Sequence, residues 1–136
     1  MSVKILDFEK YFSNIHTILD ISMDLDRDLI TSVSLLPIQR YDDDKEDFVD
    51  LTPNELNEVC YKHDEITLVT KTAKTQATYR NKNGFTVKEM FNIVKDFEKN
   101  TRPLYKWFGE IDCSHIRFEG FYRTDKENTY TIFWGS

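Results

Sequence analysis

The stretch NGFTVKEMFNIVKDFEKNTRP, residues 83–103, carries the strongest local signal in the chain. Thr86 and Glu89 have the spacing of a capping box, which marks the start of a helix. Arg102-Pro103 then predicts its end. The apolar residues between these signals recur at helical spacing on one face: Val87, Met90, Phe91, Val94 and Phe97. The stretch therefore predicts an amphipathic helix that packs on another layer of the domain.

The segments before this helix alternate between helical and strand patterns. Residues 7–19 have apolar residues at helical spacing and predict a first helix. From Leu19 to Asp26 apolar and polar residues alternate strictly, as in a half-buried strand, and residues 29–41 are its hairpin partner. Pro37 indicates an edge or a break in that partner.

A further helix signal and a hairpin signal occur before residue 83, and two strand signals follow residue 114. Residues 42–50 are strongly acidic and are expected to form a solvated loop. Thr52, Pro53 and Glu55 predict a short capped helix that ends near Lys62. The remaining segments predict strands: a hairpin over residues 65–81 that turns at 71–75, and two strands over 115–123 and 129–136.

These elements predict one α+β domain spanning residues 1–136. The sheet is expected to be mostly antiparallel, with about six strands in hairpins and two or three helices packed on it. At 136 residues, with 40% hydrophobic and 31% charged residues, the chain has the composition of a globular domain.

The composition also bears on location and source. Two cysteines are too few for a disulfide framework, and the first residues lack the apolar stretch of a secretion signal. No run reaches the ~18 apolar residues that a membrane span requires. We therefore expect a cytoplasmic protein without a membrane segment. Abundant Phe, Tyr, Ile, Asn and Lys indicate an AT-rich genome.

Charge is distributed unevenly. Residues 1–61 hold 14 acidic against 5 basic residues, whereas residues 62–136 hold 10 against 13. A net charge of −6 disfavours nucleic-acid binding and favours partners with a basic surface.

A polar cluster in WFGEIDCSHIRFEGF, residues 107–121, offers candidate catalytic groups. If the chain is an enzyme, its acid, base and nucleophile are expected among Asp112, Cys113, His115 and Glu119. On a regular strand, however, His115 and Glu119 lie roughly 13 Å apart, and Cys113 and His115 about 6.6 Å. Both separations exceed hydrogen-bond reach, so the pattern favours a polar strand over a catalytic site.

Metal and cofactor signals are absent from the sequence. Asp24, Asp26 and Asp28 have the spacing of a calcium loop, but Leu29 stands where Gly is required and Leu35 where Glu is required. The three histidines and two cysteines lack zinc-ligand spacing. No glycine-rich phosphate loop occurs. We therefore predict no metal and no cofactor.

Aromatic residues are concentrated in the second half, where residues 85–134 hold 12 of the 19. Strict alternation in the last two strands places Phe121 and Phe133 beside Arg117 and Arg123 on an outer face. Aromatic and Arg side chains in one exposed patch are typical of binding hot spots. The predicted binding residues are Trp107, Arg117, Phe121, Arg123 and Phe133.

The pattern FTVKEM, FEK, RP and WFGEIDCSHIRFEGF, ending in FWGS, resembles a segment of uncharacterised proteins encoded by large DNA viruses of protists. The resemblance covers residues 85–136 only. It agrees with the AT-rich usage and implies no activity.

Three functions are left as hypotheses. The first is a non-enzymatic interaction protein, such as an accessory or inhibitory factor that binds a basic partner. The second is a small enzyme or ligand-binding domain with a pocket around Asp112 and His115. The third is an assembly subunit or homodimer that buries the aromatic patch.

Overall fold

The computed structural model describes residues 6–24, 26–27, 29–71, 73–102, 104–105, 110–111 and 115–135, with the side chains of 104–105 and 110–111 excepted. Its helices are α1 (Phe8–Ser13), α2 (Pro53–Leu56) and α3 (Val87–Thr101). The strands of the main sheet are β1 (Ile15–Asp24), β2 (Leu29–Asp42), β3 (Asp47–Asp50), β5 (Glu65–Val69), β6 (Gln76–Arg80), β10 (Arg117–Arg123) and β11 (Thr129–Gly135). Two short pairs complete the fold: β4 (Val59–Tyr61) with β7 (Phe85–Thr86), and β8 (Leu104–Tyr105) with β9 (Glu110–Ile111).

The main sheet has seven strands in the order β3-β2-β1-β10-β11-β5-β6. All neighbours are antiparallel except β11 and β5, which pair in parallel through Thr129 with Thr67 and Tyr130 with Leu68. The predicted α+β class with a mostly antiparallel sheet is confirmed. The parallel pair joins segments that lie far apart in the sequence, and the hairpin signals did not predict it.

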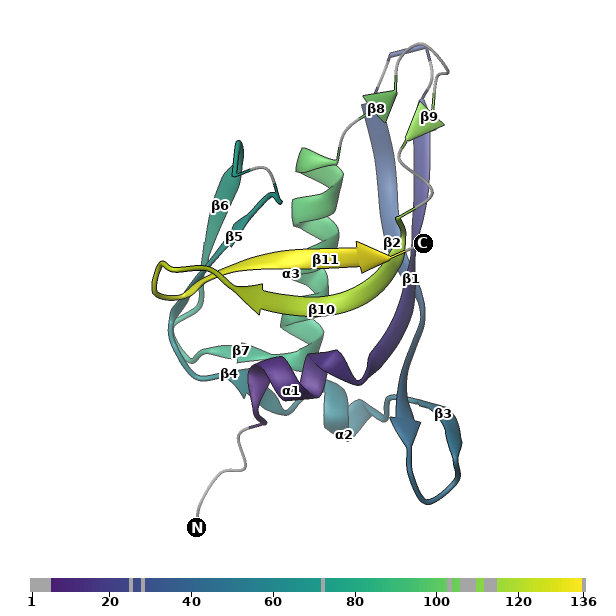
Figure 1. The fold of residues 1–136 in the computed structure, drawn as a ribbon, viewed down its shortest axis with the longest axis vertical. Helices are drawn as coiled ribbons and strands as arrows, with labels where there is room; N and C mark the ends of the chain where they lie inside the picture. Colours follow the sequence, from purple (N-terminus) through teal and green to yellow (C-terminus); the bar gives the residue numbers. More distant parts are fainter. Residues whose placement is uncertain are drawn as a thin grey trace.

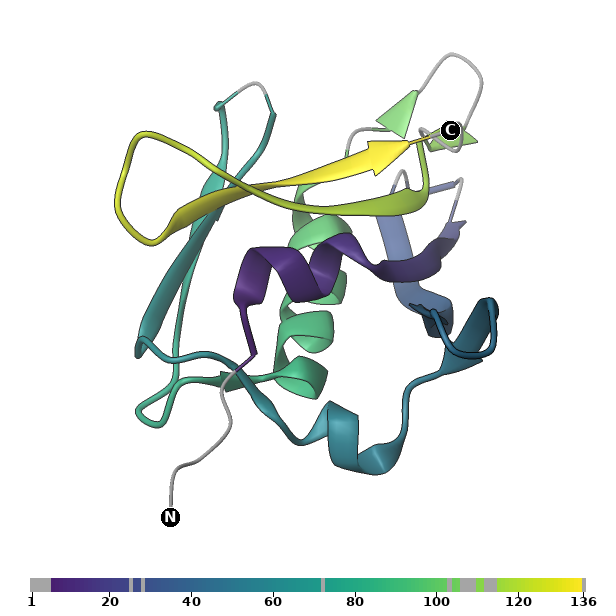
Figure 2. The ribbon, with the colours of Figure 1, turned by 60° about the horizontal axis from the view of Figure 1, so that its bottom comes forward.

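The sheet curls around α3 (Figures 1 and 2), with β1–β3 on one side of the helix and β5–β6 on the other. As the capping box predicts, Thr86 caps α3, and its backbone N–H donates to Glu89 at 2.9 Å. The apolar face of α3 is buried in the concave side of the sheet. The side of the sheet turned away from α3 is called the outer face.

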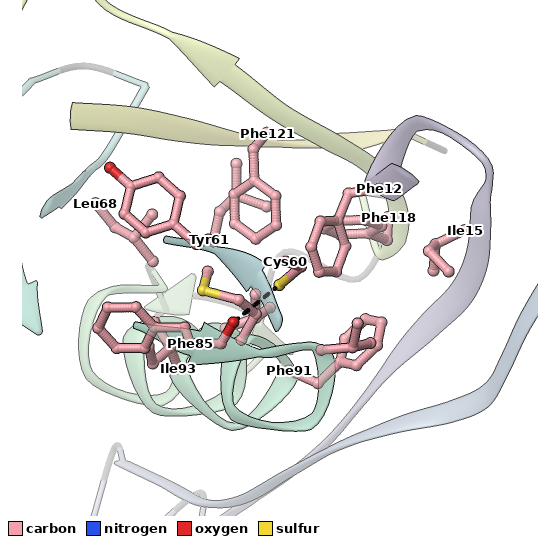
Figure 3. Close-up of a cluster of buried hydrophobic side chains, with 14 of the residues drawn as sticks. Phe12, Ile15, Cys60, Tyr61, Leu68, Phe85, Phe91, Ile93, Phe118 and Phe121 are labelled. Atoms are coloured by element: carbon pink, nitrogen blue, oxygen red, sulfur yellow. Dashed lines mark hydrogen bonds between the residues drawn. The ribbon is translucent and has the colours of Figure 1, made fainter. Parts of the chain in front are cut away.

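The core between α3, α1 and the sheet is rich in aromatic rings (Figure 3). Phe12 of α1 is fully buried and contacts Phe91 of α3 with ring centroids 5.4 Å apart. Cys60 lies in the same core, and its thiol donates to the carbonyl of Phe85 at 3.5 Å. Cys60 is 1% exposed and belongs to β4, in a segment that the sequence pattern assigned to the helix after Thr52.

Three predicted boundaries were wrong. The first helix ends at Ser13 rather than continuing to residue 19, because Ile15, Thr17 and Leu19 are spaced by two and point into the core from β1. The helix after Thr52 ends at Leu56, and the chain continues as β4. The acidic loop is partly strand: β3 pairs with the end of β2. Pro37 precedes the part of β2 that β3 covers, which agrees with the predicted edge.

Candidate interaction surface

The predicted catalytic residues fall into different surroundings. Trp107, Asp112 and Cys113 lie outside the described residues. His115 is exposed just before β10. Glu119 is exposed in β10, and its carboxylate lies beside Gly135, where a Cβ would meet Oε1 at 2.6 Å. His115 and Glu119 therefore do not form one acid–base pair in the described part of the chain.

The prediction that Phe121 lies on the outer face was wrong. Phe118 pairs with Trp134 and Phe121 with Ile132, so two residues of β10 stand opposite one residue of β11. This β-bulge contains Gly120 at φ +102°, a conformation that glycine adopts readily. The extra residue turns both phenylalanines inward, and each is 3% exposed.

Phe121 packs on α1, with its ring centroid 4.8 Å from that of Phe8 and 5.0 Å from that of Phe12 (Figure 3 shows Phe12 and Phe121). Because Phe118 and Phe121 are both buried, neither offers a stacking surface to a nucleic-acid base. Strict alternation along β10 would place these two rings on opposite faces of the strand, and the bulge prevents this. A glycine inside a strand pattern is a known sign of a bulge and was the signal that could have predicted it.

Tyr122 takes the outer position instead. It is 49% exposed, and its ring lies 4.3 Å from that of Phe133 on β11. The Nζ atom of Lys71 lies 5.1 Å from the Phe133 ring centroid, which is a cation–π contact. Arg117 is exposed on the outer face, as predicted, whereas Arg123 is exposed on the side of Phe121 and forms an ion pair with Glu9 of α1.

The exposed large hydrophobic residues share one location. Four of them lie on the outer face because an adjacent residue of the same strand is in the core. Tyr41 and Phe48 join this face because they pair with each other and Phe48 contacts His16, the strand neighbour of the buried Ile15. The six residues are Ile18, Leu29, Leu36, Tyr41, Phe48 and Tyr122, with exposures from 38% to 61%. Five of these six belong to β1, β2 and β3.

Two contacts organise this part of the outer face. Ile18 and Leu36 are direct partners across β1 and β2. Phe48 in β3 contacts Tyr41 in β2 at 5.5 Å and His16 in β1 at 4.8 Å, measured between ring centroids. These residues, together with the carboxylates that border them, form the acidic-aromatic surface: His16, Ile18, Leu36, Tyr41 and Phe48, with Asp20, Asp42 and Asp50.

Carboxylates border the rings. The β2–β3 turn and β3 contain six acidic residues and one lysine between residues 42 and 50. Asp42 shapes the turn, because its Oδ1 accepts from the backbone N–H of Asp44 at 2.9 Å. Asp50 accepts from Gln39 at 3.0 Å, and Asp20 is exposed on β1. The surface thus combines apolar area with a negative field.

A cavity of about 300 Å³ lies on the inner side of the sheet, between β5 and β11 and next to the last turn of α3. The two strands pair over only two residues each, and the cavity lies beyond them. It is lined by Val69, Thr70, Lys71, Phe97, Glu98, Thr101, Arg102, His115, Ile132 and Trp134.

The cavity contains a buried ion pair that sequence analysis missed. Glu98 is 7% exposed and Arg102 is 9% exposed. Arg102 donates to Oε1 of Glu98 through Nη2 at 2.8 Å and through Nε at 3.1 Å, and it donates to the carbonyl of His115 at 2.9 Å. Burial raises the pKa of the Glu98 carboxyl, against the opposing effect of Arg102. Glu98 follows Val94 by one helical turn, so it lies on the apolar face of the predicted helix. This position was the available sequence signal that its carboxylate is buried.

Other features of the described residues give less support for a functional site. Burial raises the pKa of the Cys60 thiol to about 12, so it is not a thiolate near neutral pH. Within the described residues no three His, Cys, Asp or Glu side chains are grouped to hold a metal ion. Over the same ranges, no helix is long and apolar enough to cross a membrane.

Comparison with known proteins gave no match to a family model, a curated protein or a solved structure. The resemblance of residues 85–136 to viral proteins therefore stays a prediction.

Proposed function

We propose that this chain is a cytoplasmic protein-interaction module that binds a basic partner through the acidic-aromatic surface. The observation that carries the proposal is that four of the six exposed large hydrophobic residues of the described chain lie together in this surface: Ile18, Leu36, Tyr41 and Phe48. Scattered apolar residues on a surface need no explanation, whereas a shared face bordered by charge is typical of a binding site.

The chemistry of the surface favours a protein ligand. Tyr41 and Phe48 offer flat aromatic area, and Ile18 with Leu36 offers aliphatic area beside it. Such side chains supply most of the binding free energy in protein interfaces, whereas a charged border guides the encounter.

The sign of the charge selects the partner. The surface lies beside the turn that holds most of the carboxylates of residues 42–50. A basic partner segment gains association rate in this field, and an acidic one is repelled. A second copy of the chain presents the same carboxylates, so the field opposes a symmetric dimer through this surface.

A displayed library of random peptides tests the proposal. We expect the wild-type chain to enrich peptides that combine Lys or Arg with apolar residues. The double variant Leu36→Ser, Phe48→Ser should lose this enrichment, because both side chains are exposed contacts rather than core. Tyr122→Ser is the matched control, since Tyr122 is equally exposed but lies on β10, outside the surface.

Two results would count against the proposal. Enrichment of peptides without basic residues contradicts the role of the carboxylates. Equal enrichment by the double variant and by the wild type contradicts the location of the site. Light scattering separates a third outcome, since a wild-type dimer that the double variant abolishes makes the surface a self-interface.

A further inference from the structure

The cavity between β5 and β11 carries an inference beyond the interaction surface. Four of its ten lining residues are apolar, and they come from both strands and from α3: Val69, Phe97, Ile132 and Trp134. Its volume of about 300 Å³ is at the lower end of the range for small-molecule sites. The size restricts an occupant to a small ligand.

Two polar atoms of the described lining have unused hydrogen-bonding capacity: the buried Nε1 of Trp134, which has no partner there, and Oε2 of Glu98. Both hydrogen bonds that Arg102 donates to Glu98 end on Oε1. Oε2 accepts a hydrogen bond from none of the described residues. A carboxylate oxygen in a largely buried residue that lines a cavity is an acceptor for a ligand's donor group.

The ion pair also restricts the charge of the ligand. Glu98 and Arg102 neutralise each other. Lys71, the other cation of the described lining, is exposed and contacts the Phe133 ring. A charged ligand beside the buried pair would therefore leave water without gaining an opposite charge there, and that desolvation is costly. An uncharged ligand avoids this cost and still uses the apolar walls.

We propose that this cavity binds an uncharged, mainly apolar small molecule that donates one hydrogen bond to Oε2 of Glu98. The walls supply the binding free energy, and the carboxylate selects ligands that carry a donor. A neutral heteroaromatic ring with one N–H group has this chemistry.

Indole and benzofuran are the probes, because they have nearly the same shape and only indole has an N–H donor. We expect indole to shift backbone amide NMR signals of the cavity residues in a saturable way. The expected Kd is on the order of 0.1–1 mM for a ligand of this size. Benzofuran should bind roughly five-fold more weakly or worse, since the carboxylate oxygen then lacks its donor.

Val69→Phe provides the second arm, because Val69 lines the cavity and is half-buried, and the larger side chain adds bulk at that wall. Val49→Phe is its matched control: Val49 is also a half-buried strand valine, but it lies in β3 at the opposite end of the sheet. Indole should bind the control as it binds the wild type and bind Val69→Phe at least ten-fold more weakly. An unchanged melting temperature confirms that each variant is folded.

Three outcomes overturn the proposal. Signal shifts that do not saturate, or that lie away from the cavity, show that indole does not occupy it. Equal affinity for indole and benzofuran would show that Oε2 of Glu98 does not accept a hydrogen bond from the ligand. Unchanged indole binding by Val69→Phe places the probe elsewhere. None of these results bears on peptide binding by the acidic-aromatic surface, so the two proposals are tested separately.

Discussion

Ile18 and Leu36 face each other across β1 and β2 on the outer face, and they are 38% and 61% exposed. Arg117 of β10 pairs with Ile18 from the other side, so an exposed cation continues the same row across the sheet. Two apolar side chains directly opposite each other in water contribute little to folding, which leaves them available for binding.

The first prediction separates Leu36 from its neighbour Leu35. Leu36→Ala should change the free energy of unfolding by less than about 0.5 kcal/mol, because the side chain is mostly in solvent. Leu35→Ala should cost about 2–5 kcal/mol, because Leu35 is 4% exposed and packs in the core. Urea denaturation measures both. A large loss for Leu36→Ala would mean that the residue is buried in solution.

The second prediction tests the β-bulge through two adjacent residues. Phe121→Ala should destabilise the fold by about 3–5 kcal/mol, because it removes a ring that packs on Phe8 and Phe12. Tyr122→Ala should cost less than about 1 kcal/mol, since it loses only the exposed contact with Phe133. Thermal unfolding distinguishes the two variants. A regular strand without the bulge would reverse their order.

The third prediction concerns two glycines in the last hairpin. Gly120→Ala should destabilise the fold by about 1–3 kcal/mol, since its φ of +102° strains any residue with a Cβ. Gly135→Ala should cost less than about 1 kcal/mol, because the added Cβ meets only the end of the exposed Glu119 side chain, which can turn away. Guanidinium denaturation gives both values, and equal costs would contradict the bulge geometry.

The fourth prediction is a pH dependence. Burial raises the pKa of Glu98 in the folded state above its unfolded value. The folded state therefore holds this proton more tightly, and the contribution of Glu98 to stability falls as the pH rises from about 4 through the folded-state pKa. Glu98→Gln has no such proton, so the stability difference, wild type minus variant, should decrease over this range.

Urea midpoints measured from acidic to neutral pH give this difference. The pair with Arg102 is part of this dependence, because it exists only while Glu98 is ionised and opposes the effect of burial on the pKa. Glu65→Gln is the control, because Glu65 is more exposed and pairs with Arg80 at the surface. A difference that stays flat for Glu98→Gln would show that the carboxylate keeps an ordinary pKa.

Local signals predicted the parts of the fold that local forces determine. The capping boxes at Thr52 and Thr86 start helices as predicted, because each joins residues three positions apart. The first helix was predicted too long because Ile15 and Leu19 fit both helical and strand spacing. Packing of β1 against β2 and β10 decided between the two.

The candidate sites depend on distant residues and were mostly missed. The acidic-aromatic surface requires the pairing of β3 with β2, which turned a predicted loop into a strand that carries Phe48. The cavity requires the parallel pairing of β5 with β11. Of the predicted binding residues, Phe133 and Arg117 lie on the outer face, whereas one extra residue in β10 turns Phe121 into the core and Arg123 toward Glu9 of α1.

The central position of β11 has a consequence for biosynthesis. This strand separates β10 from β5 in the sheet, yet the ribosome makes it after all the other strands of the main sheet. A nascent chain that lacks residues 129–135 carries two unjoined half-sheets with open edges. Such intermediates aggregate readily, so the growing chain benefits from chaperone protection until residues 129–135 are available to join the two half-sheets.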